Sequence, residues 1–185
     1  MFTFLKTATP AAEVADALWV EVRDGQITRE LAAAASEDTA QSDVALDEVI
    51  YFRSFATDLT IHRVFQHQTV LESALRDSFL QRLRDYAIAR RCTPCPLGDW
   101  VADSPNWHID RPGHDTGDPL QHLSDRFDLY VAAMRRPTER VLPVVGVLRG
   151  LCDARGVSFA LLATSAFVDY SIHTQEFLRK IRVKP

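Results

Sequence analysis

The sequence has little glycine and no excess of basic residues. Only seven of its 185 residues are glycine, and neither a Gly-x-Gly-x-x-Gly pattern nor a P-loop occurs among them, which argues against the common phosphate-cradling loops. A Gly-x-Ser-x-Gly elbow is also missing, so hydrolysis by an activated serine has no sequence support. Lysine and arginine number 21 against 25 aspartates and glutamates, so the basic excess of a general nucleic-acid binder is missing too.

Cysteine and long apolar runs are equally scarce. Three cysteines, an odd number, do not fit a disulfide framework and indicate a reducing compartment. The longest nearly uncharged apolar stretch, Gly156 to Val168, is shorter than the ~20 residues that span a bilayer. Lys6 follows a very short apolar run, and Glu13 and Asp16 interrupt the residues after it, which is not the pattern of a secretory signal. We therefore expect a cytoplasmic protein with neither a membrane nor a nucleic acid as its partner.

What the sequence does contain is the composition of an ordinary globular domain. Its residues are 46% hydrophobic and 25% charged, close to the average of folded proteins. A length of 185 residues fits one domain, and we expect residues 1–185 to form a single helical domain with an acidic N-terminal helical part over about residues 1–40.

Hydrophobic spacing is mostly helical. Leu71, Leu75, Phe79 and Leu83 follow at steps of four, the period of one helix face. Similar spacing, with N-terminal caps and C-terminal glycines or prolines, predicts further helices. The predicted helices cover residues 11–23, 28–37, 43–66, 69–91, 118–134, 139–154 and 157–182, the last range as one long helix or two. We expect an all-α bundle of about six or seven helices, packed around the aromatic helix of residues 43–66 and the apolar helix that begins near residue 157.

Two runs remain ambiguous between helix and strand. Arg126 to Met134 and Val157 to Ala163 are rich in β-branched and aromatic residues, and periodicity does not separate the two readings. We favour helix because no hairpin turn signal flanks either run.

One region, the proline- and aspartate-rich residues 92–117, interrupts the helical pattern of hydrophobic spacing. A connection this long within a compact domain is usually functional or disordered. It carries the spacing Cys92-x2-Cys95-x12-His108-x5-His114, a ligand set that suits tetrahedral zinc. A ββα finger is excluded because Pro112 separates the two histidines. A different zinc site on these four residues remains a hypothesis, with ordinary thiols and imidazoles as the alternative.

The same region suggests two further chemistries. Cys92 and Cys95 form a C-x-x-C pair that suits thiol redox work, although a position after a helix C-terminus raises rather than lowers a thiol pKa. His108-Ile109-Asp110 resembles the iron-binding motif of the 2-oxoglutarate-dependent oxygenases, whose third ligand is a distant histidine, here His122 or His173. That family has a β-helix, which a helical chain does not supply.

Two other sequence patterns give weaker support for a functional site. Asp58 and His62 lie four residues apart and could act as an acid-base pair or hold a metal; we expect instead that His62 is packed on the apolar face and hydrogen-bonded to Asp58 or a backbone carbonyl. Residues 36–48, the candidate reading segment of a helix-turn-helix, carry carboxylates and no basic residue, so phosphates would repel them.

No catalytic signature emerges. We therefore expect a non-enzymatic module that binds another protein or a second copy of itself. A metal-dependent (zinc or iron) or thiol-redox enzyme centred on residues 92–114 is the first alternative. The second is a helical pocket that takes an apolar ligand or cofactor between the aromatic helix and the last helices.

Overall fold

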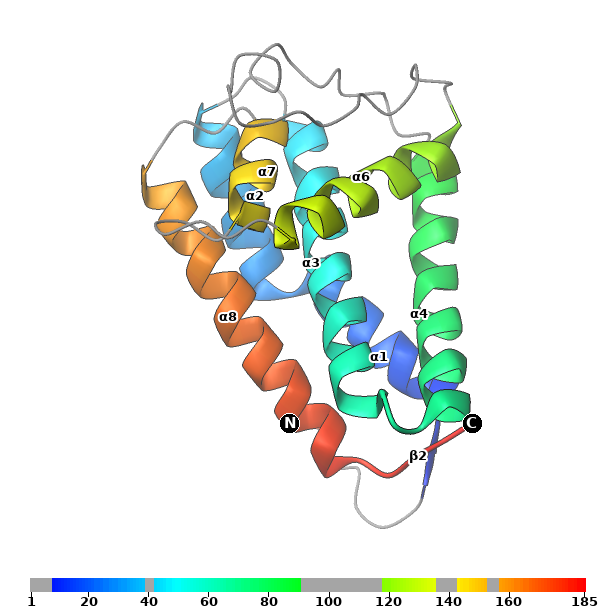
Figure 1. Cartoon of the computed structure of the whole chain (residues 1–185). Coiled ribbons are helices and arrows are strands. Elements are labelled where there is room, and N and C mark those ends of the chain that lie inside the picture. Colours follow the sequence, from blue (N-terminus) through cyan, green and yellow to red (C-terminus); the bar gives the residue numbers. More distant parts are fainter. Residues whose placement is uncertain (1–7, 39–41, 91–117, 136–142, 153–156) are drawn as a thin grey trace.

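A computed structural model describes residues 8–38, 42–90, 118–135, 143–152 and 157–185. Within these ranges the chain forms seven helices and one pair of two-residue strands (Figure 1). The elements are β1 (Thr9–Pro10), α1 (Ala11–Asp24), α2 (Gln26–Asp38), α3 (Ser42–Phe65), α4 (Thr69–Arg90), α6 (Pro119–Met134), α7 (Pro143–Leu151), α8 (Val157–Lys180) and β2 (Val183–Lys184). The expected all-α bundle is confirmed.

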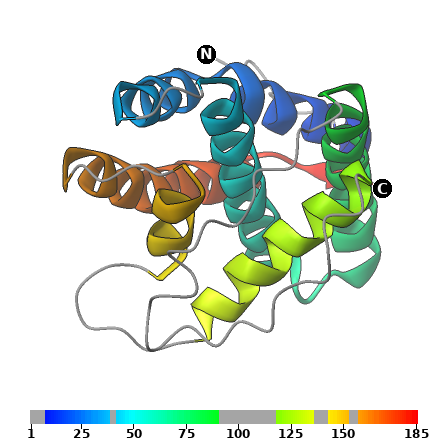
Figure 2. The same cartoon turned by 90° about the horizontal axis from the view of Figure 1, so that it is seen from above.

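Helix α3 is the centre of this bundle, as its aromatic pattern predicts. It packs against each of the other six helices of the described ranges. Figure 1 shows α8 and α4 on opposite sides of α3. Figure 2 shows α1 and α2 along one side of α3, with α6 across the other. Burial on almost every side explains why the apolar residues of α3 do not form a single stripe.

Aromatic side chains of α3 join it to α6 and α8. The ring of Phe52 lies 5.7 Å from that of Tyr130 and 5.6 Å from that of Phe167, between centroids. Phe55 stacks on Tyr130 at 5.3 Å. Such ring pairs contribute about 0.5–1.5 kcal/mol each beyond the area that they bury, so this cluster fixes how the three helices meet.

The two sequence runs that were ambiguous are helical. Residues 126–134 lie in α6 and residues 157–163 in α8. Asp118 caps α6, since its side chain accepts a hydrogen bond from Leu120 N at 2.9 Å. Helix α7 begins at Pro143, in agreement with the expectation that this proline lies in a first turn. The expected start at residue 139 and end at residue 154 lie outside the described residues.

A short parallel strand pair, absent from the sequence prediction, joins the start of α1 to the end of α8. Thr9 pairs with Val183 and Pro10 with Lys184, and Thr9 N donates to Arg182 O at 2.8 Å. Two residues are too few to leave a period-2 pattern. The pair fixes the direction in which α1 leaves β1 and α8 approaches β2.

Candidate functional site

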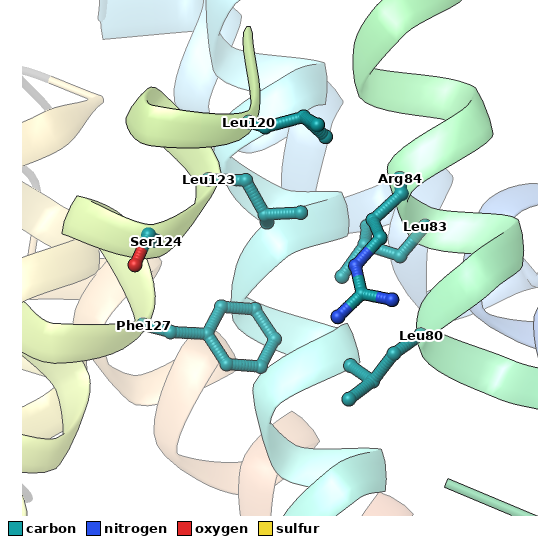
Figure 3. A pocket seen from close by; sticks show the side chains of 7 residues that line it. All are labelled: Leu80, Leu83, Arg84, Leu120, Leu123, Ser124 and Phe127. Carbon is teal, nitrogen blue, oxygen red and sulfur yellow. The ribbon is translucent and has the colours of Figure 1, made fainter. Parts of the chain in front are cut away.

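A groove lies between α4 and α6. Its cavity has a volume of about 250 Å³. Helix α4 contributes Leu80, Leu83 and Arg84 to the lining, and helix α6 contributes Leu120, Leu123, Ser124 and Phe127 (Figure 3). On each helix these residues are three or four positions apart, so they share one helical face. Figure 3 shows the Arg84 guanidinium in the space between the two helices, with Phe127 on one side and Leu80 on the other.

Arg84 differs from the other arginines of α4. Arg76 pairs with Asp58 at 2.7 Å, Arg82 with Asp16 at 2.6 Å and Arg90 with Asp47 at 3.0 Å. Arg84 forms no ion pair with any residue that the structure describes. The groove is therefore apolar apart from one exposed cation and the Ser124 hydroxyl.

Exposed apolar side chains continue beyond the groove along both helices. Leu120, at one end of the lining, is 40% exposed. Ile88 lies one turn beyond Arg84 on the same face of α4 and is 52% exposed, while Val131 lies one turn beyond Phe127 on α6 and is 38% exposed. Exposed apolar side chains that follow a groove along two helices are typical of an interaction site.

A buried ion pair holds α6, and with it one wall of the groove, against α3. Arg126 Nε donates to Glu48 Oε1 at 2.8 Å and to Oε2 at 3.0 Å, and both side chains are buried. Burial raises the pKa of the Glu48 carboxyl, and the positive charge and hydrogen bonds of Arg126 oppose that rise. The His122 ring lies beside the pair, with Nε2 3.9 Å from Glu48 Oε1.

The zinc, redox and iron hypotheses concern residues outside the described ranges. Cys92, Cys95, His108, Asp110 and His114 all lie in residues 91–117, of which the structure describes none. The two described histidines proposed as third iron ligands are both helical: His122 lies in α6 and His173 is exposed on α8. In the described part of the chain, no three His, Cys, Asp or Glu side chains are grouped as a metal site requires. The metal hypothesis stays a prediction.

The expectation for His62 was wrong. Its side chain is exposed, and its Nδ1 lies 2.8 Å from Glu72 Oε1 on α4. Asp58, the expected partner, instead accepts two hydrogen bonds from Arg76. Because α3 and α4 are antiparallel neighbours, carboxylates of one helix meet cations of the other, which spacing within one helix does not reveal.

Sequence reasoning missed the groove, although a signal for Arg84 was present. The helical neighbours of Arg84 at three and four positions are Leu80, Gln81, Ala87 and Ile88. None is a carboxylate, so the guanidinium lies on an apolar face without a partner from its own helix. Which helix faces it is a tertiary property.

Comparisons of the chain with protein-family models, with curated proteins and with solved structures found no match. None of the helices in the described ranges has both the length and the apolar run that a bilayer-spanning segment requires.

Proposed function

We propose that this chain is a non-enzymatic binding protein that holds an acidic, apolar segment of a partner protein in the groove between α4 and α6. The observation that carries the proposal is the exposed Arg84 guanidinium, which has no carboxylate partner among the described residues and lies in an otherwise apolar groove. An unpaired cation among leucines favours a ligand that brings a carboxylate together with apolar side chains. The odd number of cysteines supports a cytoplasmic setting for this binding.

The extent of the apolar surface favours a protein segment over a small molecule. A cavity of about 250 Å³ takes one or two side chains, whereas drug-sized ligands occupy roughly 300–1,000 Å³. The exposed Ile88 and Val131 continue the apolar surface past both ends of the cavity. An amphipathic helix would cover this length with anchors at i, i+3 or i+4 and i+7.

The test measures binding of two synthetic peptides to the full chain by fluorescence anisotropy. One is an amphipathic helix with leucine anchors and glutamates beside them, and the other has lysine in place of each glutamate. We expect the acidic peptide to bind at least about tenfold more tightly, as for a charge-assisted contact in an apolar setting. Equal affinities for the two peptides, or no binding of either, would contradict the proposal.

Two pairs of variants locate the binding surface. Arg84→Glu should reverse the preference between the peptides, whereas Arg63→Glu makes the same charge change at an exposed position on α3 and should leave the preference unchanged. Leu120→Asp should weaken binding, whereas Leu161→Asp, at a position 67% exposed on α8, should not. If both members of a pair behave alike, the peptide binds elsewhere.

A second copy of the chain is the competing occupant of the groove. Sedimentation of the full chain over a range of concentrations distinguishes the two. Self-association that Arg84→Glu abolishes would replace the partner segment by a homodimer, and a monomer at all concentrations supports the proposal.

A further inference from the structure

A second cavity, of about 280 Å³, lies between α1 and α8. Both helices pack against α3 but make few direct contacts with each other. Apolar walls are formed by Leu18 of α1, Ile27 of α2 and Phe177 of α8. The cavity is separate from the groove between α4 and α6, because the two share no residue.

Arg53 of α3 contacts each of the three helices that form the walls of this cavity. Its Nη1 donates to Glu21 O at 2.9 Å and to the Thr28 hydroxyl, and its guanidinium carbon lies 4.1 Å above the centre of the Tyr170 ring. The Tyr170 hydroxyl is in turn 3.0 Å from Thr57 Oγ1. One buried guanidinium thus ties α1, α2 and α8 to α3, so the cavity is preformed and a ligand does not have to order its walls.

The polar groups of the lining favour a cationic ligand. Among the described residues of the lining, Glu21 is the one carboxylate, the other polar side chains are Tyr170, His173 and Thr174, and there is no lysine or arginine. The Glu21 side chain is 52% exposed, and the one ion pair that it forms with a described residue, from Oε1 to Arg53 Nη2, is long at 3.4 Å. Among the described residues, no hydrogen bond is made to Glu21 Oε2. This oxygen can therefore accept a hydrogen bond from a ligand.

The charge of Arg53 limits the ligand to a single positive charge. Arg53 offsets part of the Glu21 charge at 3.4 Å, so a polycation would meet more repulsion than attraction. The aromatic rings of Tyr170 and Phe177 line the cavity, and aromatic rings attract cations as well as apolar groups.

We propose that this cavity binds a small primary ammonium with one apolar body. The apolar body lies against Leu18, Ile27 and Phe177, and the ammonium donates to Glu21 Oε2. The volume, just under the range typical of drug-sized ligands, limits the body to about one aromatic ring with a short linker.

The test compares three probes that share a phenethyl body and differ in the charge of the end group: phenethylamine, 2-phenylethanol and 3-phenylpropanoate. Binding of each to the full chain is followed by NMR chemical-shift titration. We expect the amine to bind at least about tenfold more tightly than the alcohol and the carboxylate, which lack its charge-assisted hydrogen bond. If the three probes bind alike, or if the amine does not bind at all, the proposal is overturned.

Variants of the chain test whether the ligand ammonium binds the Glu21 carboxylate. Glu21→Gln should reduce the affinity for the amine about tenfold and leave that for the alcohol unchanged, whereas Glu13→Gln, at an exposed position of the same helix, should change neither. Ala17→Phe fills the cavity, keeps the Glu21 carboxylate in the chain, and should abolish binding of both probes. Unchanged amine affinity in Glu21→Gln or in Ala17→Phe would place the amine elsewhere.

Discussion

Replacing Arg126 by methionine tests the buried ion pair that positions α6. The substitution keeps an unbranched apolar side chain and removes the charge that faces Glu48, whose carboxylate oxygens lie 2.8 and 3.0 Å from Arg126 Nε. An uncompensated buried charge costs roughly 3–5 kcal/mol, out of a total stability of about 5–15 kcal/mol for a domain. With a urea m-value of about 2 kcal/mol/M, the unfolding midpoint should fall by about 1.5–2.5 M.

The loss of stability in Arg126→Met should depend on pH, and the protonation of Glu48 sets the direction of this dependence. Burial raises the pKa of Glu48 in the native chain, and removing Arg126 raises it further. The native state then binds more protons than the unfolded state between the unfolded pKa of about 4.3 and the raised folded pKa. Stability therefore falls as pH rises through this window. The deficit of Arg126→Met should be small near pH ~5 and large near pH ~8.

The assay is urea unfolding at the two pH values, followed by tryptophan fluorescence. The double variant Glu48→Gln/Arg126→Met removes both charges and leaves His122, the imidazole 3.9 Å from Glu48, in place. Its stability should recover at the higher pH. An equal deficit of Arg126→Met at both pH values would refute the reasoning, because other lost contacts of Arg126 do not titrate with Glu48.

Three further predictions concern single positions. Gly25→Ala should lower the melting temperature, with a loss of about 1–3 kcal/mol, because a Cβ would lie 2.2 Å from Glu21 O. In chemical unfolding, Leu75→Ala should cost about 2–5 kcal/mol at a fully buried site, whereas Val70→Ala, at a position 70% exposed, should stay within about 0.5 kcal/mol. His62→Ala should cost under about 1 kcal/mol, and NMR titration should show the lowered pKa of Glu72 rising toward its ordinary value, since the His62 hydrogen bond is its main cause.

Helices could be predicted because the residues that define each one lie close together in the sequence. The stripe from Leu71 to Leu83 marks α4, and the Asp118 cap with Pro119 after it marks the start of α6. The strand pair had no such local signal, because parallel pairing of Thr9 with Val183 depends on where the two chain segments meet in the fold. The partner of His62 was missed for the same reason, since Glu72 lies on the next helix.

The roles of individual arginines show where sequence reasoning ends. Arg84 and Arg126 both lie on amphipathic helices, yet one is exposed in a groove and the other is buried against Glu48, 78 positions away in sequence. Local spacing indicates that Arg84 has no acidic neighbour three or four positions away on its own helix. It does not show that Phe127 lies opposite, because that depends on the position of α6.

The position of α6 gives the two arginines separable effects on binding. Arg126 holds the helix that carries Leu120 and Phe127, so Arg126→Met should weaken peptide binding together with stability, and the double variant with Glu48→Gln should restore both. Arg84→Glu, at an exposed position, should weaken acidic-peptide binding while the free energy of unfolding changes by under about 0.5 kcal/mol. Anisotropy and urea unfolding of the same samples measure both quantities. If Arg126→Met is destabilised near pH ~8 yet binds the acidic peptide as the native chain does, α6 is not the wall that the peptide contacts.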